Sequence, residues 1–350
     1  MTDTLQDLLA EARRAGASDL HLVTGRAPLL RVDGRIEPTP RRPLAPGEVD
    51  GLLRAVLSQG QWDRFTQQRE LCVSLELPEL GFFRLNLASE LGRADASIRL
   101  GREQVPRFDE LGLPETLLEH VRRPAGLVLV TGPTGVGKTT TLNALVGRLL
   151  AEERKKIVMI EDPIEFVHPP GRGLVVQREV GLDTSGFGPA VIHALRQDPD
   201  VIVIGEMRDL ETISTALTAA ETGHLVIATL HTSGAAGTVN RILDVFPPVQ
   251  QAQVRTQLAA TLQAVFTQRL LPRAVGRGRV LAYELMVATD AIRNMIREQK
   301  AHQIPSAIQT GRALGMRLMD HMVRDLYDAG EITWDSALSA VGDRRVLERG

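Results

Sequence analysis

One segment of the sequence constrains the fold more than any other. Gly132-Pro-Thr-Gly-Val-Gly-Lys-Thr139 matches the pattern G-x-x-x-x-G-K-[ST], and it lies between the apolar run Gly126–Thr131 and the helical pattern Lys138–Ala151. Glycines let the backbone curl so that successive N–H groups point at phosphate oxygens, and the helix N-terminus adds partial positive charge. The segment therefore predicts a strand, a phosphate-binding loop and a helix within an α/β fold.

The same loop predicts the ligands. Lys138 would reach the β- and γ-phosphates of ATP, and the hydroxyl of Thr139 would bind Mg²⁺. The alternative is a glycine-rich turn with a chance lysine, but the only lysines are Lys138, Lys155, Lys156 and Lys300, which argues against a coincidence at this spacing. The predicted nucleotide-binding residues are Gly132, Pro133, Thr134, Gly135, Val136, Gly137, Lys138, Thr139 and Thr140.

The pattern of apolar segments divides the chain into regions. Residues 1–100 combine a helix with short strand-like stretches and predict a small α+β domain, and residues 101–112 are typical of a linker. Residues 113–287 alternate apolar strands with helices, which predicts a mainly parallel sheet covered on both faces. Residues 288–350 predict a helical C-terminal region. The strands expected in the core are Gly126–Thr131, Lys156–Ile160, Asp200–Gly205, His224–Leu230 and Arg279–Met286.

Composition argues against several classes of protein. The 41 basic and 43 acidic residues give a net charge of −2, which disfavours the broad basic face of a nucleic-acid-binding protein. Aromatic residues make up only 3%, so no stacking platform for single strands is expected. The single cysteine, Cys72, rules out an internal disulfide or a multi-cysteine zinc site. No signal peptide or membrane-spanning run is visible, and we expect a cytoplasmic protein.

Two acidic segments follow predicted strands of the core, at the edge where open α/β sheets bind their ligands. Glu206 follows an apolar strand, but Gly205 precedes it where many P-loop enzymes carry aspartate, so we expect Mg²⁺ to be held through water near Glu206. Hydrolysis also needs a group that positions and deprotonates water, and the segment Ile160–His168 offers Glu165 and Asp162. The alternative for these acids is helix capping or loop solvation, and for Asp162 the two interpretations are balanced.

Two histidines, His224 and His231, flank the next predicted strand. They are seven residues apart and point to opposite faces unless the strand ends between them, so we do not expect a joint metal site. Each could contact the γ-phosphate or a neighbouring molecule, but a histidine at such a position is more often structural.

In order and spacing, these segments resemble the ATPases that power type II secretion and type IV pili. Ala291-Ile-Arg-Asn-Met-Ile-Arg-Glu298 is similar to the AIRNLIRE signature of the PilT-like retraction branch, as is the stretch His302–Gly311. Assembly and secretion ATPases of this superfamily usually carry a four-cysteine motif, which a chain with Cys72 alone lacks. The matched boxes are the P-loop Gly132–Thr139, an aspartate box Ile160–His168, a Walker B box Leu195–Asp209 and a histidine box Thr222–Thr232.

The resemblance implies a homohexameric ATPase motor that drives pilus retraction and twitching motility, with a PAS-like N-terminal domain on a RecA-like core. It also implies an inner-membrane platform protein as partner, pilin as an indirect partner, and a peripheral position at the inner membrane. From the composition, no nucleic acid is expected as a partner. A PilU-like accessory ATPase and a related assembly or secretion ATPase are alternatives. More distant ones are a nucleotide-gated scaffold and a nucleic-acid motor. The helix Ala291–Glu298 either couples the nucleotide state to the partner or simply packs.

Matching positions imply roles for individual residues. Glu165 corresponds to the catalytic glutamate, and Glu206 to the Walker B glutamate. Arginines of the N-terminal region would approach the phosphates from another domain or subunit, where a guanidinium neutralises developing charge; Arg93 is left open. Ordinary surface ion pairs are the alternative for these arginines. The predicted catalytic residues are Glu165, Glu206, His231, His224, Arg84 and Arg99.

Overall fold

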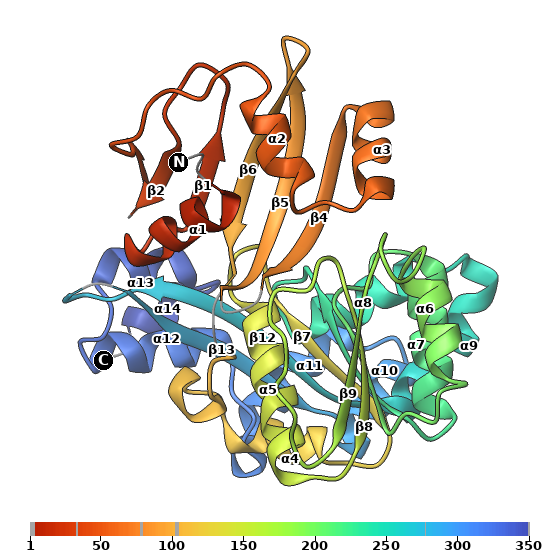
Figure 1. The fold of residues 1–350 in the computed structure, drawn as a ribbon. Coiled ribbons are helices and arrows are strands. Elements are labelled where there is room, and N and C mark those ends of the chain that lie inside the picture. Colours follow the sequence, from red (N-terminus) through yellow and green to blue (C-terminus); the bar gives the residue numbers. More distant parts are fainter. Residues whose placement is uncertain (1–3, 33, 78–79, 102–104, 277, 349–350) are drawn as a thin grey trace. The chain divides into compact units, whose positions relative to one another are not determined.

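The structure, a computed structural model, forms two compact units (Figure 1). The smaller unit comprises residues 1–104 together with 163–167, and the larger unit comprises residues 105–162 and 168–350. The residues described are 4–32, 34–77, 80–101, 105–276 and 278–348. None of the helices in these ranges has the length and apolar character that crossing a membrane requires.

The smaller unit is a six-stranded antiparallel sheet with the strand order β3-β2-β1-β6-β5-β4. Its first helix begins with a reciprocal capping box between Thr4 and Asp7, which satisfies backbone N–H groups of the first turn. The elements are α1 (Leu5–Arg14), β1 (Asp19–Leu22), β2 (Leu29–Val32), β3 (Arg35–Pro38), α2 (Glu48–Arg54), α3 (Gln59–Gln68), β4 (Glu70–Leu77), β5 (Gly81–Glu90) and β6 (Arg93–Leu100).

One face of this sheet is apolar and the other is polar. Along β5, Phe83, Leu85 and Leu87 are buried, whereas the intervening Arg84 and Asn86 are exposed. This alternation follows from the two-residue period of a strand. The buried face packs on α1, α2 and α3 through their apolar residues, and the polar face carries the predicted arginines.

The larger unit contains a seven-stranded sheet in the order β13-β12-β7-β11-β10-β8-β9. Only β13 pairs antiparallel, so the predicted mixed α/β fold with a mainly parallel sheet is confirmed. The strands are β7 (Gly126–Thr131), β8 (Lys156–Glu161), β9 (Leu174–Glu179), β10 (Val201–Ile204), β11 (Leu225–Leu230), β12 (Leu262–Pro272) and β13 (Arg279–Val287). Strands β9 and β12 were not predicted from the sequence.

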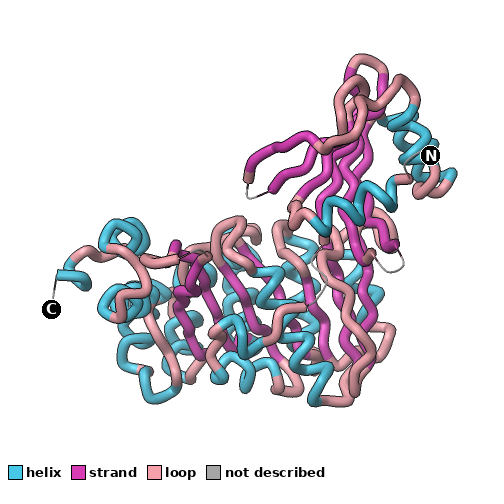
Figure 2. The backbone as a smooth tube through the Cα atoms, turned by 60° about the vertical axis from the view of Figure 1, so that its left-hand side comes forward, coloured by secondary structure: helices cyan, strands magenta, loops and turns pink. Residues whose placement is uncertain are grey.

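Helices cover both faces of this sheet, which explains why its central strands are apolar throughout. In β10, Val201 and Val203 face a core cluster with α4 (Glu115–Val121) and α5 (Lys138–Glu152), and Ile202 and Ile204 face the opposite cluster. Figure 2 shows these strands in magenta between cyan helices. The opposite cluster includes α6 (Phe187–Ala194), α7 (Leu210–Glu221), α8 (Ala235–Asp244), α9 (Pro248–Thr261), α10 (Asp290–Arg297) and α11 (Ile304–Thr310).

The last helices form a smaller apolar cluster against the outer strands of the same sheet. Val323, Ile332 and Ala337 lie at its centre and contact residues of β12 and β13. We call this the C-terminal cluster; it consists of α12 (Met319–Asp328), α13 (Trp334–Ala340), α14 (Arg345–Glu348) and the residues of β12 and β13 against which they pack. By contacts, the predicted helical region 288–350 groups with the larger unit.

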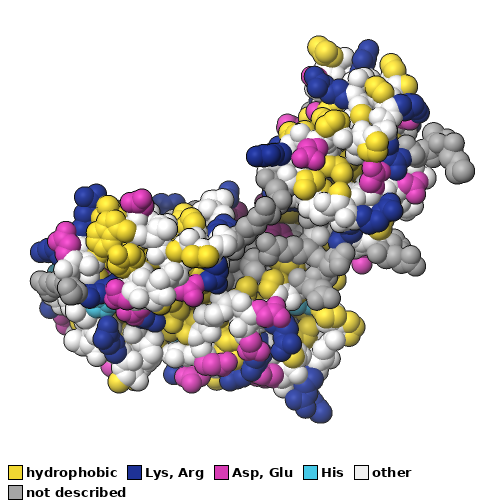
Figure 3. Space-filling model, turned by 90° about the vertical axis from the view of Figure 1, so that its left-hand side faces the viewer, with side chains coloured by type: hydrophobic (Ala, Val, Ile, Leu, Met, Phe, Trp, Pro, Cys, Tyr) yellow, Lys and Arg dark blue, Asp and Glu magenta, His cyan; other side chains and the backbone are white. Residues whose placement is uncertain are grey.

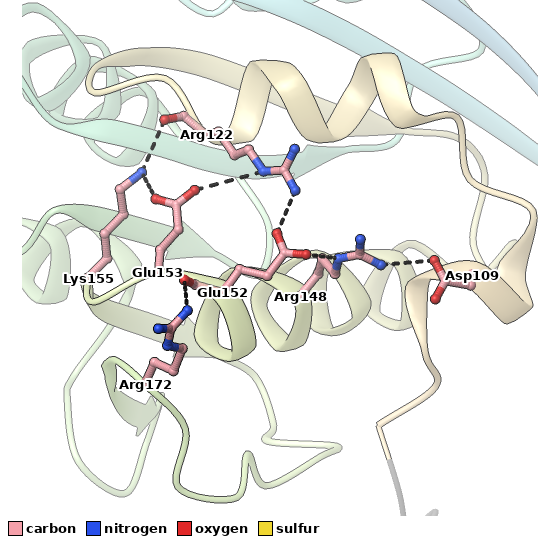
Figure 4. A network of polar contacts seen from close by, with 7 residues as sticks. All are labelled: Asp109, Arg122, Arg148, Glu152, Glu153, Lys155 and Arg172. Carbon is pink, nitrogen blue, oxygen red and sulfur yellow. Dashed lines mark hydrogen bonds and ion pairs between the residues drawn. The ribbon is translucent and has the colours of Figure 1, made fainter.

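A polar network fixes the far end of α5 (Figure 4). Arg148 donates to Asp109, which precedes α4, and also to Glu152 one turn further along α5. Glu152 in turn accepts from Arg122, which follows α4. The helix that begins at the phosphate-binding loop is therefore held at its other end by ion pairs. The remaining members of the network are Glu153, Lys155 and Arg172.

Candidate nucleotide-binding site

The parallel register brings the predicted motifs to one edge of the larger sheet. The loop Gly132–Thr139 follows β7, His231 follows β11, Glu206 lies two residues beyond β10, and Asp162 follows β8. These strands are neighbours in the order β7-β11-β10-β8. The carboxyl ends of parallel strands therefore collect the loop, an acid and a histidine at the position where open α/β sheets bind ligands.

The loop is curled and depends on glycine. Gly132, Gly135 and Gly137 have φ values of 140°, 81° and 88°, in the region that side chains rarely adopt. A Cβ atom at Gly132 would also lie 2.5 Å from the carbonyl oxygen of Gln268. Gly137 is the N-cap of α5, whose first residue is Lys138. The backbone thus presents a helix N-terminus toward the inside of the loop, an arrangement suited to an anion.

Lys138 is buried inside this loop without a carboxylate partner. Its Nζ donates to the carbonyl oxygens of Gly132 at 2.9 Å and Pro133 at 3.0 Å, and lies 3.5 Å from Nδ1 of His231. Burial lowers the pKa of the ammonium group, and the charge of Glu206 partly opposes this. Within the described residues, no carboxylate lies within ion-pairing distance of Nζ. A buried cation that has only neutral partners fits a phosphate group in the same loop.

Glu206 and His231 lie together beside the loop. Nε2 of His231 is 3.3 Å from the Glu206 carboxylate, and its Nδ1 is 3.4 Å from the hydroxyl of Thr134. Arg208 also pairs with Glu206 at 2.8 Å. His231 therefore connects the P-loop with the acid after β10. Arg208 was not predicted as a site residue, because the sequence marks it only by its position two residues after Glu206.

Strand β12 supports the loop from its other side. The side-chain amide of Gln268 donates to the carbonyl oxygen of Val136 at 2.6 Å and its oxygen accepts from the hydroxyl of Thr141 at 2.9 Å. Arg279 of β13 donates to Gly135 at 3.3 Å. These supporting residues were not predicted, because Gln268 lies in a stretch that also contains Gln263, Thr267 and Arg269 and so does not stand out.

Thr139 and Thr140 lie in the first turn of α5 and are partly buried. Within the part of the chain that the structure describes, the Thr139 hydroxyl makes no hydrogen bond, so it fits a metal ligand. Asn143 donates to the Thr139 carbonyl at 2.9 Å and is bonded through its side-chain oxygen to Nε2 of His168 at 2.8 Å. Burial lowers the pKa of His168 to about 4. The end of the aspartate box is thereby attached to the first turn of the P-loop helix by a neutral histidine.

Glu165 is exposed and lies in the segment Pro163–Val167, which groups by contacts with the smaller unit. The neighbouring Phe166 is buried. The structure therefore assigns Glu165 to a different compact unit from Lys138 and Glu206. Its catalytic role stays a prediction.

His224 lies just before β11, at the end opposite to His231. A strand of this length separates the two residues by roughly 20 Å. The Nδ1 atom of His224 is 3.3 Å from the carbonyl oxygen of Ala219. Within one chain, His224 is therefore not brought to the P-loop, and its functional role stays a prediction.

Arg84 and Arg99 are direct cross-strand neighbours on the polar face of the smaller unit. Nε of Arg99 donates to Asp19 at 3.0 Å, and Nε of Arg84 donates to the sulfur of Cys72 at 3.3 Å. Burial raises the pKa of the Asp19 carboxyl, but hydrogen bonds from Ser18 and Arg99 lower it further, so the net shift is downward. Like charges directly opposite destabilise a sheet, and the ion pair with Asp19 offsets part of this cost. The phosphate-binding role of Arg84 and Arg99 stays a prediction.

Two further expectations concern metal and partner binding. Within the described ranges, no three His, Cys, Asp or Glu side chains form a ready metal cluster. Ile292 and Ile296 of α10 are buried in the core, and Arg293 donates to the carbonyl oxygens of Ala259 and Ala260 at the end of α9. Arg293 therefore packs α10 onto α9, while Arg297 is exposed.

On the face of the larger unit drawn in Figure 3, Lys and Arg side chains are interspersed with Asp and Glu.

The chain is similar to known proteins over most of its length. The family described as type II/IV secretion system protein matches residues 1–333. The type IV pilus retraction ATPase PilT of Pseudomonas aeruginosa is 46% identical over 95% of this chain and 96% of its own length. A twitching motility protein of Neisseria gonorrhoeae is 44% identical over 89% of this chain and 83% of its own length.

The structural comparison covers both units. A crystal structure of the pilus retraction motor PilT with bound ADP superposes with a TM-score of 0.94 and 43% identity, covering 99% of this chain and 100% of that one. Together with the family match, this confirms the resemblance inferred from the motifs. The chain belongs to the type II/IV secretion system protein family.

Proposed function

We propose that this protein is an ATP-hydrolysing motor that assembles as a homohexamer and drives retraction of type IV pili. The observation that carries the proposal is the buried Lys138 ammonium, which lies in a glycine loop with neutral partners and beside His231 and Glu206. The similarity to PilT over nearly the whole chain supports the biological role. In this proposal the larger unit is a RecA-like ATPase core and the smaller unit is a PAS-like domain.

The proposed binding roles follow from the geometry of the loop. Lys138 and the loop N–H groups would bind the phosphates, and Thr139 would hold Mg²⁺, with Glu206 acting through water. When bound, Mg²⁺ neutralises charge on the phosphate oxygens as a Lewis acid. His231 lies close enough to Lys138 and Glu206 to orient both. Arg208 pairs with the same carboxylate oxygen of Glu206 that His231 approaches.

The remaining residues would act only when the two units, or two subunits, come together. Glu165 positions and deprotonates the attacking water. Arg84 and Arg99 bind the phosphate charge, and release of phosphate removes the anion that holds them, which allows the smaller unit to move. Residues 102–104 of the predicted linker lie outside the described residues. His224, at the other end of β11, contacts a neighbouring subunit.

The proposed partners are an inner-membrane platform protein and, through it, pilin, so the motor works in the cytoplasm at the base of the pilus. Deletion in the source organism tests this role through pilus number and surface motility. Retraction predicts an excess of pili and loss of twitching. It also predicts rescue by the wild-type gene but not by K138A. Bald cells would instead indicate an assembly ATPase, and normal pilus number with weakened retraction would indicate a PilU-like accessory.

A further inference from the structure

Glu284 bridges the first residues of two helices of the larger unit. Its Oε1 accepts a hydrogen bond from the backbone N–H of Ala235 at 2.8 Å, and Ala235 is the first residue of α8. Its Oε2 accepts from the backbone N–H of Met319 at 3.4 Å, and Met319 is the first residue of α12. Both donors belong to the N–H groups that a helix cannot satisfy internally, and both helix ends carry partial positive charge.

No side-chain cation compensates this carboxylate. Burial raises the pKa of Glu284, the two backbone N–H groups lower it, and the nearby Asp320 raises it. In the described part of the chain, no lysine or arginine lies within ion-pairing distance of Glu284. A partly buried acid that depends on two helix ends alone is costly to maintain, and such acids are frequent at functional positions.

The start of α8, which Glu284 contacts, is hydrogen-bonded to the loop that follows His231. Thr238, one turn into α8, donates its backbone N–H and its hydroxyl to the carbonyl oxygen of Gly234 at 2.9 and 2.8 Å. The same hydroxyl lies 2.6 Å from that of Thr232, which directly follows His231. Hydrogen bonds therefore connect the start of α8 to the segment 231–234, which carries the ring that contacts Lys138 and Glu206.

The α12 end is held equally closely. Leu285 and Arg317 exchange two backbone hydrogen bonds, at 2.9 and 3.0 Å, which fixes the chain just before α12 against β13. From Met319 onward, α12 enters the C-terminal cluster through Val323 and Leu326. Glu284 is thus the polar connection between that cluster and the edge of the sheet that carries the P-loop.

We propose that Glu284 is a positioning residue for ATP hydrolysis. It holds the 231–234 loop in place for catalysis by fixing the start of α8 to the start of α12, which the Leu285–Arg317 pair itself fixes to β13. The inference deepens the proposed function and rests on the proposed role of His231. Glu284 itself does not touch the nucleotide.

Two variants of Glu284 and one control test the inference on the full-length protein. E284Q keeps an oxygen for one of the two N–H groups, and E284A removes both acceptors. V323A loosens the packing of α12 without removing the carboxylate. We expect kcat to fall about tenfold in E284Q and further in E284A, with KM for ATP changed by less than about twofold. Amide exchange at residues 232–238 should accelerate in both Glu284 variants but not in V323A.

A double-mutant cycle then separates positioning from general destabilisation. In an H231A background, E284Q should lower kcat by less than about twofold, because the side chain of His231, through which Glu284 acts, is already absent. Independent, multiplying effects of E284Q and H231A would overturn the inference, as would an equal loss of kcat in V323A at a matched Tm. If H231A alone keeps the wild-type kcat, the proposed role of His231 fails. In that case, unchanged amide exchange in E284Q would show separately that Glu284 does not hold the 231–234 loop in place.

Discussion

Acidification from pH 7 to pH 5 should destabilise the larger unit through His168. This side chain is buried, and burial lowers its pKa from 6.5 to about 4. The unfolded chain takes up the proton below pH 6.5, whereas the folded protein resists it until pH falls close to 4. The contribution of neutral His168 to stability is therefore complete above pH 6.5 and is lost progressively as pH falls toward 4.

The two pKa values determine the size of this effect. At pH 5 the unfolded state is almost fully protonated at this position, and the folded state is almost fully neutral. Proton linkage then lowers the free energy of unfolding by about 2 kcal/mol between pH 7 and pH 5, and by about 3 kcal/mol in total below pH 4. The protonated ring would remain near Asn143, whose side-chain oxygen can still accept from Nε2.

Tryptophan fluorescence can follow the unfolding of the larger unit, which contains His168. The chain has two tryptophans; Trp62 lies in the smaller unit and Trp334 in the C-terminal cluster. In a W62F background, urea unfolding followed through Trp334 reports on the larger unit. H168Q is the matched control, because glutamine can donate to Asn143 but does not titrate. The stability difference between W62F and W62F/H168Q should shrink by about 2 kcal/mol from pH 7 to pH 5.

Parallel pH dependence in the two proteins would refute the reasoning. His120 and His321 also have pKa values lowered first by burial, and both are present in each protein. Their contributions therefore cancel in the comparison. Only the titration of His168 remains.

Two more predictions concern the loop and the arginines. G132A should abolish nucleotide binding in an ADP titration, because its Cβ would meet the Gln268 carbonyl at 2.5 Å. G135A strains the backbone at φ 81° but meets nothing within 4 Å, so it should weaken binding without abolishing it. Equal binding by both would contradict the loop geometry. R99A should lower kcat by about 100-fold or more with little change in KM. If Arg99 acts across subunits, mixing R99A with K138A chains should restore part of the activity, and no restoration would place its action within one chain.

Much of the larger unit could be predicted, because its signals are local. A strand buried on both faces has to be apolar throughout, as Val201–Ile204 is, and a phosphate-binding loop has to combine glycines with a lysine at fixed spacing. The expected position of the acids at the carboxyl ends of strands follows from parallel pairing alone. These features depend on neighbouring residues and on the topology, so the sequence displays them directly.

The residues and strands that support the site could not be predicted in the same way. Gln268 bonds to Val136 and Thr141, partners more than 120 positions away along the chain. Strand β12 begins directly after α9 without a turn residue, and the edge strand β9 is only partly buried, so neither showed a strand pattern. Glu284 was missed because its partners are backbone groups of two distant helices. Contacts of this kind depend on the folded arrangement and leave no local pattern.

Phosphate release by the purified full-length protein with Mg²⁺ and ATP tests the central claim most directly. The account predicts steady hydrolysis by the wild type and no activity in K138A. It also predicts that E165Q binds ATP with near-normal affinity but hydrolyses it at least about 100-fold more slowly, because the group that deprotonates water is missing. Wild-type protein that neither binds nor consumes ATP, or an E165Q variant as active as the wild type, would contradict the account.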